Sequence, residues 1–281
     1  MALTVEDEKT RRPELPARAR YIYEQEQVAK FLATASRDGV PNVALIVSQT
    51  PVGEGLVAFG EFMMVKTQSN LGENPKVASL AVTEKLEMAG FKGEVLEWVR
   101  SGPYIDKINS VDFFRYNAYA GIHNAAVTAV TRVMDLPGRV SFSTVGLEFL
   151  KVRACGRLSR SRPLKGATTP GAICEKFNSV MSIKVVAFMD ADGYPCVVPA
   201  FATWFRAPGE LRFMVSSYNR WVKELPLPAM VALNVVTMDL LTYQVKGKLE
   251  RIDRAAGLET GVVRVDEVYS SIPPLCGERL A

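Results

Sequence analysis

Apolar and polar residues alternate over short stretches along much of the chain, which is the pattern of half-buried β-strands. From Pro41 to Thr50 the pattern places Val43, Leu45 and Val47 on one face and Asn42, Ala44, Ile46 and Ser48 on the other. We expect the first set to face the core. Asp38-Gly39, just before this strand, has the turn chemistry of a β-hairpin.

The same reasoning predicts further strands over 31–36, 57–64, 77–83 and 91–95, and helices over 21–30 and 67–75. Thr67 is the expected N-cap of the second helix, and Pro75 its stop. Several short antiparallel strands with one helical crossover are the makeup of a small β-barrel.

This unit occurs twice. Residues 30–95 align without a gap on residues 184–249, at a shift of 193 − 39 = 154, which superimposes Asp38-Gly39 on Asp192-Gly193 and Lys92-Gly93 on Lys246-Gly247. Such a period is domain-sized. We therefore predict an α+β chain of two tandem β-barrels, with domains over 1–160, including a helical insertion, and 161–281. A site normally built between two subunits could then form within one chain, as in an intramolecular pseudo-dimer.

Outside the repeat the pattern is less regular. It predicts a largely helical stretch over 104–134, a strand over 140–157, a linker over 159–171, a strand over 261–269 and a turn-like segment over 272–279. In the second copy, Pro226 and Pro228 leave room for little more than one helical turn over 220–228.

Composition excludes several classes of protein. The 281 residues carry a net charge of +4, which does not indicate nucleic acid, and no stretch approaches the roughly 20 apolar residues of a membrane span. We expect a cytoplasmic protein whose partner is a small molecule, not a membrane. Residues 151–165 contain six basic and no acidic residues. On a strand, Lys151, Arg153 and Arg157 share one face. This face is either solvated or forms a positively charged surface that binds an anionic ligand.

Cysteine and histidine usage argues against a metal site. Cys155, Cys174, Cys196 and Cys276 lack C-x-x-C spacing, and His123 is the only histidine. Free structural thiols are expected, with a disulfide pair as the alternative. His123 lies in a stretch that we interpret as helical, where a structural role is favoured over that of an axial haem ligand.

A candidate phosphate site stands where the strand over 57–64 meets the next helix. Lys66 offers a charge, Thr67 a hydroxyl, and a helix N-terminus offers free backbone N–H groups, while Asn70 lies one turn on. The alternative is a plain N-cap beside a surface lysine. In the second copy Arg220 keeps the cation, Trp221 replaces the threonine, and Ser216 and Ser217 are the remaining hydroxyl donors.

Three segments carry a resemblance to a known family. They are FLATASRDGVPNVALI (31–46), LVAFGEFMMVKTQSNLGENPKVASLAV (56–82) and VDEVYSSIPPLCGERL (265–280). In this order they resemble the pyridoxamine 5'-phosphate oxidase-like family of flavin-binding split barrels. The resemblance implies two tandem split barrels. Its members are typically homodimers with flavin mononucleotide (FMN) in each of two clefts, so this chain looks like a covalent pseudo-dimer, acting as a monomer or pairing again as a homodimer.

The resemblance also implies roles for particular residues. Asn42, Ala44, Ile46 and Ser48 would line the isoalloxazine ring, and Lys66 and Thr67 would hold the phosphate. We expect one well-formed site on the first copy, closed by the second, with two sites or none as the alternatives. Arg153, Ser216 and Arg220 are lesser candidates for cofactor contacts. Because the Arg-Lys pairings expected on the third strand are replaced by Glu61-Phe62-Met63-Met64, pyridoxamine phosphate oxidation itself is not predicted.

The resulting hypothesis is an FMN-dependent oxidoreductase that passes two electrons between a reduced donor, such as NAD(P)H, and a small acceptor. No acid–base residue is assigned, because in flavin enzymes the cofactor carries the chemistry. A non-catalytic protein that binds flavin, haem or a related cofactor is the alternative, and a structural pseudo-dimer with an empty cleft is a third.

Overall fold

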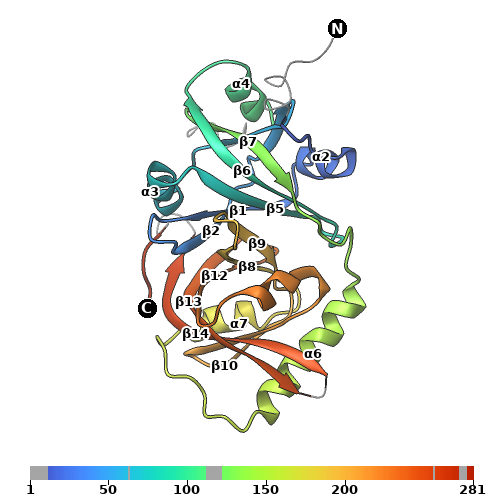
Figure 1. The fold of residues 1–281 in the computed structure, drawn as a ribbon, viewed down its shortest axis with the longest axis vertical. Coiled ribbons are helices and arrows are strands. Elements are labelled where there is room, and N and C mark those ends of the chain that lie inside the picture. The colour runs from blue at the N-terminus through green and yellow to red at the C-terminus, as the bar shows by residue number, and fades with distance from the viewer. Residues whose placement is uncertain (1–11, 63, 112–121, 256, 272–276) are drawn as a thin grey trace.

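Two seven-stranded antiparallel sheets form the body of the protein (Figure 1). The computed structural model describes residues 12–62, 64–111, 122–255, 257–271 and 277–281. The first part contains α2 (Ala17–Glu24), β1 (Ala29–Ala35), β2 (Pro41–Leu45), β3 (Thr50–Gly53), β4 (Leu56–Gly60), α3 (Val65–Glu73), β5 (Lys76–Val82), β6 (Met88–Val99), α4 (Pro103–Asn109) and β7 (Ala125–Val133).

The second part repeats the plan. It contains α6 (Phe142–Leu158), α7 (Gly171–Phe177), β8 (Ile183–Met189), β9 (Pro195–Pro199), β10 (Thr203–Ala207), β11 (Glu210–Met214), the 3₁₀ helix η2 (Ser217–Glu224), β12 (Ala229–Val236), β13 (Thr242–Ala255) and β14 (Leu258–Ser270). The strand orders are β2-β1-β5-β6-β7-β4-β3 and, from the matching end, β9-β8-β12-β13-β14-β11-β10, so corresponding strands hold corresponding places. This confirms the predicted α+β fold of two tandem split barrels.

The two barrels pack through equivalent residues. Phe31, Ala33, Val43, Ala78 and Val82 of the first sheet form one buried cluster with Val185, Ala187, Val197, Ala232 and Val236 of the second, each 154 positions further on. In Figure 1, β1 and β2 lie against β8 and β9 at this junction. Each repeat contributes the same set of positions to this interface. That is the arrangement of an isologous dimer interface, which here lies within one chain.

The opposite face of the same strands points into each barrel. Leu32, Ile46, Phe59 and Val77 fill the first barrel, and their counterparts Val186, Ala200, Phe213 and Val231 fill the second. The predicted alternation along β2 is therefore real, but both of its faces are covered. Val43 and Leu45 pack against the other repeat, while Ala44 and Ile46 pack inside their own barrel.

Two predicted elements are wrong. In the stretch over 104–134, predicted to be largely helical, Pro103–Asn109 is helix α4 and 112–121 lie outside the described residues, but 125–133 form strand β7. Pairing with β4 on one side and β6 on the other overrides the alanine-rich, helix-like composition of this last part. The stretch over 140–157 is helix α6, begun by Ser141, whose hydroxyl accepts the Thr144 N–H at 3.1 Å. Its buried residues, Val145, Glu148, Phe149, Val152 and Gly156, follow a period of three and four.

Helix α6 lies against the second sheet. Phe149 and Val152 share a buried cluster with Ala202 and Met214. The domain division at 160/161 stays a prediction. None of the helices in the described ranges combines the length and the apolar character needed to cross a bilayer.

Candidate functional site

The site begins at the N-terminus of α3, the helix on the left of Figure 1. The N-cap is Met64, and no side chain caps the helix. The prediction of Thr67 as N-cap is therefore wrong, because the helix starts two residues earlier and Thr67 lies within its first turn. A methionine cannot accept hydrogen bonds from the first backbone N–H groups. These groups, with the positive end of the helix dipole, are available to an anion.

Lys66 in this first turn has an ammonium group that is buried without a hydrogen-bond partner among the described residues. It stands over the ring of Tyr269, from the end of β14. Burial, together with the nearby charges of Lys246 and Arg279, lowers the pKa of Lys66 to about 7, and Glu267 opposes this shift. A buried ammonium group without a hydrogen-bond partner destabilises the protein and favours the binding of an anion.

The second repeat supplies the rest of this cluster, which we call the first seat: Lys66, Lys246, Arg279, Glu267 and Tyr269. Glu267 is already engaged, since it accepts from the Tyr269 hydroxyl at 2.8 Å and pairs with Arg279 at 3.1 Å. Lys246 also has a lowered pKa through burial and makes no ion pair within the described ranges. Three cations face one carboxylate, leaving two positive charges uncompensated. Figure 1 places the C-terminus on the same side of the molecule as α3.

Neutral polar groups connect the first seat to β2 and β1. The side-chain amide of Asn42 donates to the Thr67 oxygen at 3.3 Å, which leaves the Thr67 O–H as a donor. Asn70 donates to Thr34 at 3.0 Å and so holds α3 against β1. The structure thus brings Asn42, Thr67 and Asn70 together, as expected.

The other predicted ring contacts lie deeper in the first barrel. Ala44 and Ile46 pack beside Phe59 and Met64. The Ser48 hydroxyl accepts the Gly60 N–H at 3.0 Å. Their role in lining a ring stays a prediction.

The pseudo-symmetric position, which we call the second seat, is balanced in charge. Arg220 on η2 pairs with Asp135 at 2.7 Å and stacks on Trp221 at 4.7 Å. Lys92, the counterpart of Lys246, binds Asp190 at 2.5 Å and Asp192 at 2.7 Å, and Arg132 binds Asp192 at 3.1 Å. Burial alone would lower the pKa of Lys92, but the hydrogen bonds that its ammonium donates to the two aspartates raise it. Here three cations meet three carboxylates.

Ser216 and Arg153 have structural partners. Ser216 caps η2, and its hydroxyl donates to Glu148 of α6 at 2.5 Å. Arg153 stacks on Phe149 at 4.4 Å and donates to the Asn178 carbonyl at 3.4 Å, on the side of α6 that meets the second sheet. The predicted positive strand face with Lys151 and Arg157 does not form, because these residues lie on a helix.

Sequence reasoning missed Lys246, Tyr269 and Arg279. A signal existed, because Lys246 was paired with Lys92 in the repeat and the other two lie in the third family-like segment. His123 is exposed and outside any helix, just before β7. Cys155, Cys174 and Cys196 are free thiols, while Cys276 lies outside the described residues. Across the described ranges, no cluster of His, Cys, Asp or Glu is suited to a metal ion.

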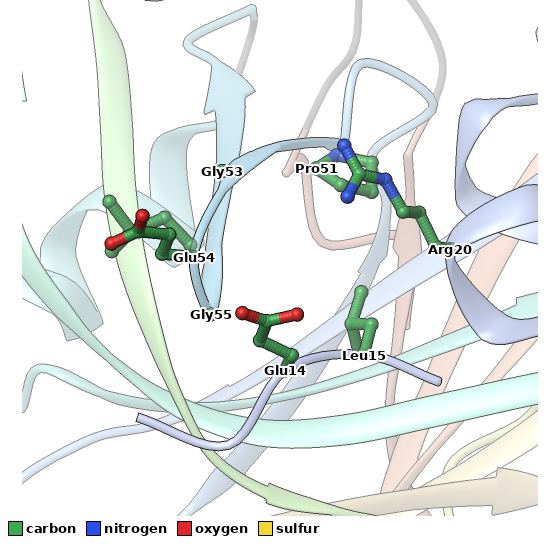
Figure 2. Close-up of a pocket in the computed structure, with 8 residues that line it drawn as sticks. Glu14, Leu15, Arg20, Pro51, Gly53, Glu54 and Gly55 are labelled. Carbon is green, nitrogen blue, oxygen red and sulfur yellow. The ribbon is translucent and has the colours of Figure 1, made fainter. Parts of the chain in front are cut away.

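A shallow surface pocket lies near α2, on the opposite side of the first repeat from α3 (Figures 1 and 2). Its lining residues are Glu14, Leu15, Arg20, Pro51, Gly53, Glu54, Gly55 and Leu56. With two carboxylates and one guanidinium, it does not offer the positive surplus that the first seat provides.

No family model matches this chain. An uncharacterized protein of Methanocaldococcus jannaschii is 38% identical over 84 residues, which are 29% of this chain and 56% of that protein. The chain thus spans about half the length of the curated relative it matches.

Solved structures with similar folds include an FMN-binding protein from Syntrophomonas wolfei subsp. wolfei, at 21% identity and a TM-score of 0.37, covering 42% of this chain and 82% of that one. A putative pyridoxamine 5'-phosphate oxidase from Lactobacillus delbrueckii is 17% identical with a TM-score of 0.35, and the match covers 43% of this chain and 93% of that one. The haem storage protein HutZ from Vibrio cholerae is 14% identical with a TM-score of 0.31, and the match covers 40% of this chain and 86% of that one. Scores this low do not establish a shared function, and the fold assignment rests on the two sheets.

Proposed function

We propose that this protein is an FMN-dependent oxidoreductase that holds the phosphate of its cofactor in the first seat. Lys66, the Thr67 hydroxyl and the first N–H groups of α3 come from the first repeat, and Lys246 and Arg279 from the second. The observation that carries the proposal is the buried Lys66 ammonium, which has no hydrogen-bond partner in the part of the chain that the structure describes. Such groups are rare in folded proteins, and an anion from solution would supply what it lacks.

The charge at the first seat fits a phosphate monoester. Such a group carries about 1.5 to 2 negative charges near neutral pH and offers three acceptor oxygens. Three cations against one carboxylate leave a surplus of similar size. A phosphodiester or a single carboxylate would leave part of that surplus unpaired. This comparison favours the phosphate end of FMN over haem, whose acidic groups are separate carboxylates.

Once bound, the flavin supplies the two-electron chemistry, and the protein binds, orients and shields it. On this proposal Asn42 and Ala44 of β2, with Ile46 and Ser48 just after it, line the ring. Asn42 joins this row to the phosphate end through its hydrogen bond to Thr67. The reduced donor is a nicotinamide nucleotide or a similar compound, the acceptor is a small molecule, and the reaction takes place in the cytoplasm.

One cofactor per chain follows from the different charge balance of the two seats. In the second seat Arg220 and Lys92 already have carboxylate partners from this chain. An anion there would have to displace these carboxylates. We therefore assign cofactor contacts to neither Arg220 nor Ser216, nor to Arg153.

The spectrum of the purified protein tests this proposal. We expect a yellow protein that absorbs at roughly 450 nm, as flavins do, and that bleaches on anaerobic addition of NADH or NADPH. A yellow protein that no nicotinamide donor bleaches would indicate a non-catalytic flavin carrier instead of an enzyme. A Soret band would indicate that the cofactor is haem instead of a flavin. A colourless protein that does not bind added FMN would contradict both.

A further inference from the structure

Helix α6 carries apolar side chains on two opposite faces. One face, with Phe149 and Val152, is buried against the second sheet. The other exposes Leu147, Leu150 and Leu158, at 53%, 64% and 79% of their surface, with exposed Ala154 between them. Separations of three, four and four residues place these four side chains in one stripe along a helix. A helix that is apolar on both sides is normally covered on both.

Basic residues border this leucine stripe. At 100° per residue, Lys151 lies on one side of the stripe and Arg157 on the other. The chain then continues through exposed Arg160, Arg162 and Lys165, and residues 149–174 contain no acidic residue. Within the described ranges these five cations form no ion pairs with the protein.

This charge pattern narrows the choice of partner. A second copy of the chain would bring the same cations against these, and three leucines on one 17-residue helix offer less than the roughly 800 Å² per partner of a stable interface. A flat surface with negative charge matches both the stripe and its borders.

We propose that α6 and the basic segment after it bind the surface of an anionic phospholipid bilayer, with the leucines entering the headgroup region and the cations lying against lipid phosphates. Amphipathic helices of this kind lie in the plane of the interface. Basic residues near an anionic leaflet add to the attraction within a Debye length. The expectation of no membrane partner rested on the lack of an apolar run long enough to span a bilayer, a criterion that does not detect a helix lying on a membrane surface.

Co-sedimentation of the full chain with vesicles tests this inference. We expect it to pellet with vesicles of phosphatidylcholine and phosphatidylserine at low salt, and to remain in solution with phosphatidylcholine alone. Leu150→Gln with Leu158→Gln should reduce the vesicle-bound fraction at least tenfold, and Lys151→Gln with Arg157→Gln should reduce it and weaken its salt dependence. Met238→Gln is the matched control, since Met238 is 68% exposed in the second repeat but lies outside α6.

Two outcomes would overturn the inference. One is equal or absent binding to both kinds of vesicle by the unmodified chain. The other is a concentration-dependent dimer, seen by light scattering, that the leucine variant abolishes, because the stripe would then be covered by a second copy. Thermal unfolding of each variant checks that it is folded. None of these results depends on whether the protein binds a flavin.

Discussion

Replacing Lys66 with methionine separates a ligand-binding lysine from a structural one. The side chain keeps its length and apolar stem but loses its charge. A hydrogen bond to a charged group contributes about 1.5–3 kcal/mol. At about 1.4 kcal/mol per factor of ten, FMN affinity should fall by about 10-fold to 150-fold. Arg220→Met, which removes the equivalent cation from the second seat, should change affinity by less than about threefold, because Arg220 already pairs with Asp135 and is assigned no contact with the cofactor.

The same substitution should stabilise the protein in the absence of ligand. A buried polar group without a partner costs about 1–3 kcal/mol, and since Lys66 is only half-buried we take the lower end, about 1 kcal/mol. For a chain of this size that corresponds to a rise in Tm of about 2–4 °C. Isothermal titration with FMN and differential scanning calorimetry measure the two effects.

The gain in stability from Lys66→Met should depend on pH in a definite direction. The folded-state pKa of Lys66 is lowered from 10.5 to about 7, so between these values the unfolded chain binds more protons and stability rises with pH. The advantage of Lys66→Met should therefore be largest below pH 7 and disappear towards pH 10. Lower affinity without a gain in stability, or equal effects of Lys66→Met and Arg220→Met, would refute the reasoning.

Three further predictions concern other parts of the structure. FMN affinity of the unmodified chain should fall as pH rises from 7 to 9, because Lys66 loses its proton while Tyr269, with a pKa raised to about 12, stays neutral. Titrations should show a flatter profile for Lys66→Met. Asp190→Asn with Asp192→Asn should lower the free energy of unfolding by about 2–4 kcal/mol, because it leaves the Lys92 side chain, only 5% exposed, without a carboxylate partner. Asp135→Asn, which breaks the exposed pair with Arg220, should cost less than about 0.5 kcal/mol in the same denaturant titrations. Val43→Ala and Val197→Ala remove equivalent methyl groups from the inter-repeat cluster, so each should cost about 1–2 kcal/mol and leave a single unfolding transition; a large loss from one alone would contradict the symmetric interface.

The repeat made the architecture predictable. Equivalent residues such as Val43 and Val197 lie at equivalent places in the interface, so an ungapped alignment within one sequence indicated both barrels and the way they pair. The first half of the strand predicted over 41–50 is β2, although the chain then turns before β3 begins at Thr50, and the start of α3 near Lys66 is close to the predicted one. These features depend on local alternation and turn chemistry, which sequence carries directly.

Features that depend on distant partners could not be read in this way. The 125–133 segment becomes a strand only because β4 and β6 flank it, and 140–157 was assigned a period of two where its buried residues follow a period near 3.6. Of the residues at the first seat, only those from the first repeat were proposed from the sequence. Lys66 and Thr67 follow one another in the chain, whereas Lys246, Tyr269 and Arg279 reach them only through the packing of the second repeat.

Counting the FMN sites per chain tests the central claim most directly. Calorimetric titration of the purified, ligand-free chain, with its molar mass measured in parallel, should give a single site per chain that Lys66→Met and Lys246→Met each weaken at least tenfold and that Arg220→Met leaves nearly unchanged. Two equal sites per chain, or a single site that responds to Arg220→Met and not to Lys66→Met, would contradict the account.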